Sequence, residues 1–280
     1  METHVLLLVL CGAVLHASWN AIVKGSSDKL LDLTQTAVWS GILAAIALPF
    51  FPPPSWEAWP YMVASTVVHF FYFLLVAGAY KFGDLTLAYP IMRGTGPLLV
   101  ALLSGPLIGE NLTPFAWLGV GLVCCAIFTL GVDGWRRGKA ARAGIGFALL
   151  NAAVIASYTL LDGLGARISG DGISYMLWLS VFDAFPVGLF VLYRWRRPVL
   201  AHARKRWRFG IAGGGAMVGS YGIALWAMTV APIASVAALR ESSVIFATVL
   251  GALFLKEKFG WSRVAAAAAM VGGAVALRLG

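Results

Sequence analysis

Two arginines lie in apolar stretches of this chain, and they occupy equivalent places. Arg93 and Arg240 are separated by 147 residues, and the same 147 residues separate Glu110 from Glu257, which follow the two stretches. A guanidinium inside a membrane costs about 2.5–3.5 kcal/mol on insertion scales, so by default it faces a cavity or a partner. The chemistry to expect is therefore anion binding, with a carboxylate or phosphate as ligand, or an ion pair.

Several partners are open to these arginines. One arrangement gives Arg240 an acidic partner and leaves Arg93 for a ligand. Another pairs Arg93 with Glu241, and Asp183 is a third candidate partner. Arg240 and Glu241 are neighbours, so on a helix their side chains diverge by about 100° and should not pair with each other.

The surroundings of the two arginines differ. Pro90, Gly94, Gly96 and Pro97 flank Arg93 and are expected to weaken the helix there, whereas Arg240 is expected in an unbroken helix. Broken helices at membrane depth are tolerated against protein or a wet cavity, where their free dipoles meet substrate. We therefore expect Arg93 to bind substrate. We expect ion pairing or gating from Arg240, Glu241, Asp162 and Asp183.

Polar and aromatic side chains also recur at helical spacing. Three apolar stretches each carry such a face: His16, Trp19 and Asn20; His69 and Tyr72; Asn151, Tyr158 and Asp162. These faces are expected to line one cavity, and the alternative is hydrogen bonding that holds the helices together. Asp162 has a further alternative, which is contact with water at the end of its stretch. His16 and His69 are candidates for responding to a proton gradient.

The composition places these residues in a membrane. The chain is 60% hydrophobic and 12% charged over 280 residues, which is typical of an integral membrane protein. A helical span needs about 20 apolar residues. Ten stretches fit: 5–24, 32–50, 59–80, 86–108, 114–132, 143–165, 173–193, 208–229, 232–255 and 261–279. The expected fold is all-α, and the short loops leave no room for a soluble catalytic domain.

A second offset supports a duplication. Trp19 and Tyr158 align at an offset of 139, as do Trp39 and Trp178. We predict two five-helix repeats, residues 1–134 and 143–280, joined by a basic loop at 135–142. Five crossings invert the second copy, and inverted repeats around a central cavity are typical of alternating-access carriers.

Charge in the loops predicts the orientation. Seventeen of the 21 Lys and Arg residues lie in alternate loops, and two, Arg167 and Arg278, lie in the opposite loops. The positive-inside rule then places both termini outside the cytoplasm. The net charge of +9 is thus assigned to topology and contact with membrane lipids, and no nucleic-acid partner is expected.

Motifs for other chemistries do not occur in the sequence. It has no HExxH, GxSxG or Walker-type pattern, only four histidines, and three cysteines without metal-ligand spacing. We expect no enzyme activity, cofactor or metal. Two alternatives to transport remain: a membrane receptor or assembly factor, and an intramembrane enzyme that uses Asp162 and Asp183 as a carboxylate pair.

Two segments carry a family resemblance. They are Arg93-Gly-Thr-Gly-Pro97, followed by Gly109-Glu110-Asn-Leu-Thr, and Arg240-Glu241-Ser-Ser, followed by Leu255-Lys-Glu257. The whole chain resembles the EamA-type branch of the drug/metabolite transporter superfamily, as two repeats. The motifs are degenerate apolar patterns, which identify the fold better than the substrate.

The resemblance implies a secondary transporter of the bacterial inner membrane that exports small metabolites, amino acids including aromatic ones among them. It implies a cavity lined by spans 1, 3, 4, 6, 8 and 9, which adds Tyr89, Tyr221 and Trp226 to the substrate-binding candidates. Protons are a further candidate partner, and the expected state is a monomer or weak homo-oligomer. Many relatives have both termini in the cytoplasm, whereas the loop charges here predict the reverse.

Overall fold

The computed structural model describes residues 1–82, 85–137, 142–247 and 261–280, with side chains described outside 73–74, 76–90, 130–144, 195–197 and 261–263. No strand occurs in these residues. The helices are α1 (Thr3–Lys24), α2 (Lys29–Ala47), α3 (Trp59–Phe82), α4 (Leu85–Ile108), α5 (Pro114–Arg137), α6 (Arg142–Ile168), α7 (Gly172–Val230), α8 (Ile233–Arg240) and α10 (Trp261–Leu279), with short 3-10 turns at Leu48–Phe50 and Trp56–Ala58.

Local sequence signals set several helix ends. The Asp28 carboxylate accepts a hydrogen bond from the Leu31 amide at 3.1 Å and caps α2. Asp171 caps α7 in the same way through the Ile173 amide at 2.9 Å. Gly109, with φ of 72°, follows the last residue of α4, where a left-handed conformation lets the chain turn away.

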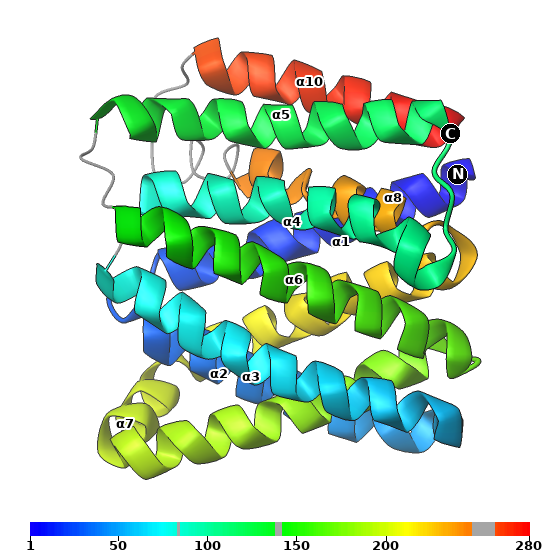
Figure 1. Cartoon of the computed structure of the whole chain (residues 1–280). Helices are drawn as coiled ribbons and strands as arrows, with labels where there is room; N and C mark the ends of the chain where they lie inside the picture. The colour runs from blue at the N-terminus through cyan, green and yellow to red at the C-terminus, as the bar shows by residue number, and fades with distance from the viewer. Residues whose placement is uncertain (83–84, 138–141, 248–260) are drawn as a thin grey trace.

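The helices lie side by side in one bundle, with α5 and α10 along one edge and α2, α3 and part of α7 along the opposite edge (Figure 1). Both chain ends lie at the same end of the bundle, where the Met1 ammonium donates to the Arg278 carbonyl oxygen at 3.2 Å. Chain ends on the same side agree with an even number of crossings.

Length and composition identify six stretches of the described residues that can cross a membrane. They are Thr3–Lys24, Lys29–Phe50, Ile91–Ile108, Ile145–Ile168, Gly172–Arg194 and Pro198–Val230. Shorter apolar helices cover Pro114–Thr129 and Val264–Leu279. The all-helical class predicted from composition is confirmed for the described residues, and these six stretches have the length and composition of membrane spans. The count of ten crossings and the inversion of the repeats stay predictions.

One departure from the expected pattern concerns the seventh and eighth stretches, which form the single helix α7 of 59 residues. A straight helix of this length would extend about 90 Å, three times the hydrocarbon thickness. The ribbon instead turns back on itself, and α7 contains Pro186 and Pro198 (Figure 1). The two predicted stretches, 173–193 and 208–229, are therefore present as two arms of one helix.

The two arms of α7 both pack against α2 at closely approaching glycines. A Cβ added to Gly41 would overlap the Cβ of Ala184 on the first arm. A Cβ added to Gly214 on the second arm would lie 2.8 Å from the Ser40 amide nitrogen. Small residues at these places let the two backbones approach closely. Helices in a membrane associate through such close packing, because the surrounding lipid provides no hydrophobic driving force.

The second departure concerns where a helix is interrupted. We expected a weakened helix at Arg93 and an unbroken helix through Arg240, and the structure has the reverse. The α4 helix continues through Arg93 and its flanking prolines, whereas α8 ends at Arg240 and a new helical segment starts at Ser243. A proline removes one backbone donor, and in a packed bundle the neighbouring helices compensate for the loss.

Candidate functional site

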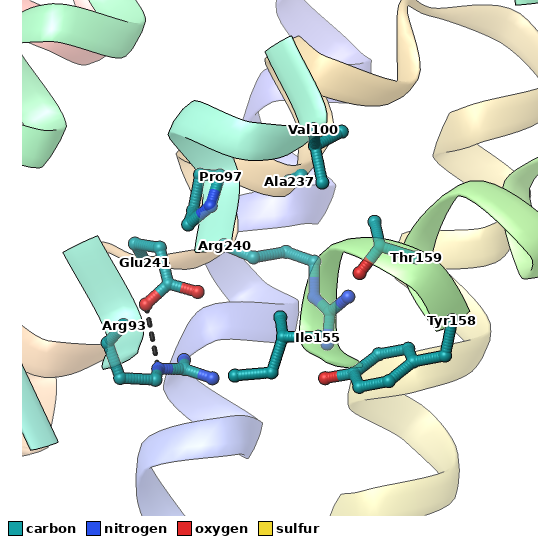
Figure 2. Close-up of a pocket in the computed structure, with 9 residues that line it drawn as sticks. All are labelled: Arg93, Pro97, Val100, Ile155, Tyr158, Thr159, Ala237, Arg240 and Glu241. Carbon is teal, nitrogen blue, oxygen red and sulfur yellow. Dashed lines mark ion pairs between the residues drawn. The ribbon is translucent and has the colours of Figure 1, made fainter. Parts of the chain in front are cut away.

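Three helices from both halves of the chain enclose a small pocket (Figure 2). The lining comes from α4, α6, α8 and the turn after α8: Arg93, Pro97 and Val100; Ile155, Tyr158 and Thr159; Ala237, Arg240 and Glu241. The cavity measures about 10 Å³, which is room for roughly one water molecule. The two arginines singled out by the sequence thus lie in one pocket between the repeats.

Arg93 forms an ion pair with Glu241 inside this pocket. The Arg93 Nε lies 2.8 Å from the Glu241 Oε2, and the two side chains are only 8% and 6% exposed. The Arg93 Nη2 donates to the Ser243 Oγ at 3.2 Å and lies 3.4 Å from the His16 Nε2. Of the open arrangements, the structure has the one that joins Arg93 to Glu241 across the repeats.

The interruption between α8 and the segment that starts at Ser243 places Arg240 and Glu241 where helix dipoles favour their charges. Arg240 is in the last turn of α8, where the helix dipole favours a cation. Glu241 lies two residues before the segment that starts at Ser243, and its carbonyl accepts from the Val244 amide at 3.0 Å. A carboxylate near a helix start is likewise favoured. The adjacent opposite charges therefore suit a break better than a continuous helix.

Arg240 has different surroundings from Arg93. Its guanidinium carbon lies 5.0 Å from the centre of the Tyr221 ring, a cation–π contact. Figure 2 shows the side chain extending across the pocket toward Thr159 and Tyr158. Among the described residues, no carboxylate oxygen lies within 4.0 Å of its guanidinium nitrogens. Of the two arginines, Arg93 and not Arg240 takes the carboxylate, which is one of the arrangements that the sequence left open, and the binding or gating roles of both stay predictions.

A second group of polar side chains gathers next to the pocket, and we call it the acid cluster: His69, Asp162 and Asp183. The His69 Nδ1 lies 3.2 Å from the Asp183 Oδ2, and the His69 Nε2 lies 4.0 Å from the Asp162 Oδ2. Asp162 is fully buried and does not meet water. It also accepts hydrogen bonds from the hydroxyls of Tyr221 and Tyr175, the latter at 3.3 Å.

Of the remaining substrate-binding candidates, some lie at the pocket and others lie outside its lining. Tyr158 lines the pocket, and its ring lies 4.3 Å from the His69 ring and 5.8 Å from the Tyr72 ring. Trp19 packs edge-on against His16 at 5.0 Å, outside the pocket lining.

Two further candidates are used elsewhere in the bundle. The Asn20 amide donates to the His16 carbonyl at 2.8 Å, within its own helix. The Trp226 ring lies 6.3 Å from His4, near the start of α1. Tyr89 is on α4, and its side chain lies outside the described residues. The binding roles of all these residues stay predictions.

Sequence reasoning did not find Ser243, Tyr175 or Ser65 as members of these groups. Ser65 lies 3.2 Å from the His69 Nδ1, one helical turn away on α3. A weak signal existed for Ser65, since it shares a helix face with His69. No such signal existed for Tyr175, because its contact with Asp162 depends on how α6 packs against α7.

Ion pairs also join elements at both ends of the bundle. At one end Glu110 accepts from Arg167 at 2.5 Å and from the Ile233 amide at 3.0 Å, where α8 starts. Glu110 thus joins the first half of the chain to the second, and its counterpart Glu257 lies outside the described residues. At the other end Asp32 pairs with Arg206 at 2.8 Å and with His202 at 2.6 Å.

No group of three or more His, Cys, Asp or Glu side chains in the described ranges is arranged to hold a metal ion. The arrangement at the centre is instead a pocket with two guanidinium groups, one carboxylate and aromatic walls. These side chains have the chemistry to bind the anionic group of a small polar molecule in a wider form of the pocket.

Comparisons with known proteins place this architecture. A search of curated proteins gives no match. A solved crystal structure matches with a TM-score of 0.74 over 100% of this chain and 98% of that one, at 19% sequence identity, which shows a shared fold. The model of the EamA-like transporter family matches twice, at residues 3–132 and 142–279. The duplication is thereby confirmed, and this multi-pass membrane protein belongs to the EamA-like transporter family.

Proposed function

We propose that the chain is a secondary transporter that exports small metabolites carrying a carboxylate, with amino acids, including aromatic ones, as substrates. The observation that carries this proposal is Arg240, a guanidinium in the central pocket with no carboxylate partner among the described residues. A guanidinium matches a carboxylate through two parallel hydrogen bonds. Family membership supports transport as the activity.

The rest of the pocket suits the other parts of an amino acid. The Arg93–Glu241 pair supplies a carboxylate near which a substrate ammonium can be held. Tyr158 supplies an aromatic wall, and Ile155 and Val100 supply apolar surface. The closed cavity of about 10 Å³ admits no amino acid, so the cycle has to widen it from either side in turn. Residues from both halves line it, which supports alternating access between inverted repeats.

The test is exchange of labelled substrate by purified protein in liposomes, run over a panel of amino acids and related carboxylates. We expect exchange of at least one aromatic amino acid and little exchange of amines that lack a carboxylate. Arg93→Ala should reduce the flux, because the loss of its guanidinium leaves Glu241 buried without its cation. Saturable binding without any flux would favour a receptor over a transporter.

For the orientation we propose both termini outside the cytoplasm of a bacterial inner membrane. The termini lie together at one end of the bundle. The Asp32–Arg206 pair lies at the other end and joins two of the basic segments. That distribution is the one the positive-inside rule describes. A C-terminal reporter that is active only in the cytoplasm should give no signal, while the same reporter inserted after Gly25 should be active.

A further inference from the structure

We propose that the acid cluster is a proton-binding site, and that Tyr221 links its protonation to the binding of a substrate carboxylate at Arg240, so that proton and substrate move in the same direction. This inference rests on the proposed transport function. It goes beyond it by naming the second species that is carried and the residues that hold it.

The cluster has the composition of a proton site. His69 lies between two carboxylates, with one ring nitrogen facing Asp183 and the other facing Asp162. By themselves, two buried carboxylates and one imidazolium leave one negative charge over, which is costly in a low-dielectric interior unless a nearby cation or a bound proton compensates it. Ionisable groups within a membrane bundle commonly carry protons for the same reason.

The hydrogen bonds around Asp162 indicate which partner carries charge. Tyr175 and Tyr221 both direct their hydroxyls at its two oxygens, as donors to an ionised carboxylate would. The groups that face the cluster come from four helices: Ser65 and His69 on α3, Tyr158 and Asp162 on α6, Tyr175, Asp183 and Tyr221 on α7, and Arg240 on α8. Arg240 is a cation in contact with this group, through the Tyr221 ring.

Tyr221 connects the two sites physically. Its hydroxyl donates to Asp162, and its ring lies beneath the Arg240 guanidinium at 5.0 Å. Before substrate binds, the positive charge of Arg240 stabilises the Asp162 carboxylate across this ring. A substrate carboxylate on Arg240 neutralises that charge, so the ionised form of Asp162 loses support and the cluster takes up a proton.

The sign of the coupling follows from these charges. Binding of an anionic group favours binding of a proton, and by linkage the proton favours the anion to the same degree. The protein then carries both or neither across the membrane. Export of substrate down its own gradient would carry protons out of the cell with it.

The experiment uses liposomes loaded with an exchanged amino acid and a pH-sensitive dye, diluted into substrate-free buffer. Valinomycin and equal K⁺ on both sides prevent a membrane potential. We expect the interior to become alkaline as substrate leaves, with about one proton per substrate molecule. An unchanged interior pH during efflux would overturn the proposal, and so would acidification, which is the sign of counter-movement.

Two variants test whether the acid cluster and Tyr221 are responsible for the proton movement. Asp162→Asn should lower the number of protons moved per substrate at least tenfold, and Tyr221→Phe, which keeps the ring under Arg240, should lower it at least threefold. Glu57→Gln removes an exposed carboxylate and is the matched control, with a wild-type ratio expected. If Asp162→Asn does not fold, Asp183→Asn replaces it, since its carboxylate faces the opposite nitrogen of His69. Wild-type ratios in these variants would refute the assignment.

Failure of this inference can be told apart from failure of the proposed function. Exchange of labelled for unlabelled substrate needs no net proton movement, so it tests transport alone. Wild-type protein without exchange on any panel member removes the proposed function. Wild-type protein that exchanges substrate but moves no protons removes only the proton site.

Discussion

Arg240→Gln is expected to reduce transport of carboxylate substrates severely. The substitution keeps a polar side chain of similar length and removes the charge that faces the pocket. Loss of one partner from a buried charge-assisted contact costs about 2–5 kcal/mol, and each 1.4 kcal/mol is about tenfold in affinity. Exchange in liposomes at a fixed low substrate concentration should therefore fall by about thirtyfold or more.

Two controls separate charge from geometry in this experiment. Arg240→Lys keeps the charge and loses the planar pair of donors, so intermediate exchange with a weaker apparent affinity is expected. Arg208→Gln removes an exposed arginine of α7 and should leave exchange at the wild-type rate. Exchange at the wild-type rate in Arg240→Gln would remove Arg240 from the binding model and return Arg93 to first place.

The second large effect is expected from Glu241→Gln, which leaves the Arg93 guanidinium buried without its carboxylate. Removing one partner of a buried ion pair typically costs about 3–5 kcal/mol. For a protein of 150–250 residues, 1 kcal/mol corresponds to about 2–4 °C in Tm, so a fall of roughly ten degrees is expected. Thermal unfolding of the purified protein in detergent measures this directly.

The paired substitution gives the decisive comparison. Arg93→Met combined with Glu241→Leu removes both charges, and apolar pairs of similar volume often restore the stability that a single substitution loses. We expect a Tm for the double variant above that of Glu241→Gln and no exchange activity. A double variant less stable than the single one would show that Arg93 is held mainly by Ser243 and His16 instead of by Glu241.

The two arginines of the pocket could be predicted from the sequence, but the ion pairs within the pocket could not. The shared offset of 147 identified Arg93 and Arg240 as equivalent, and both line one pocket. The partner of each could not be chosen, because spacing along a helix gives the faces of that helix and not its neighbours. Glu241 reaches Arg93 only through the packing of α8 against α4.

The interruption at Arg240 shows a different limit of sequence reasoning. Proline and glycine near Arg93 predicted a weak helix from local rules, yet α4 is continuous. Nothing in the local propensities of Arg240 and Glu241 predicts a helix end, since both are good helix formers. The break becomes understandable only when both charges are placed against the two helix dipoles and their partners across the pocket.

The acid cluster was predicted in parts. His69 was a candidate titrating group, and Asp162 and Asp183 were expected in ion pairs or gates or, in one alternative, as a carboxylate pair, but the position of His69 between them was not predicted. The three residues come from α3, α6 and α7, and 114 positions of sequence separate the first from the last. Only the tertiary packing brings them together, with Tyr175 and Tyr221 completing the group.

The close contact between α2 and α7 has a mechanical consequence. The α2 helix belongs to the first repeat by sequence, but its backbone is in contact with both arms of α7 in the second, at Gly41 and Gly214. In the same way Gly119 of α5 approaches the Gly273 carbonyl of α10, so that an added Cβ would lie 2.9 Å from it. Such glycine contacts leave little room for sliding. The units that evolution copied are therefore not the units that can move: each rigid body of the carrier combines helices from both copies.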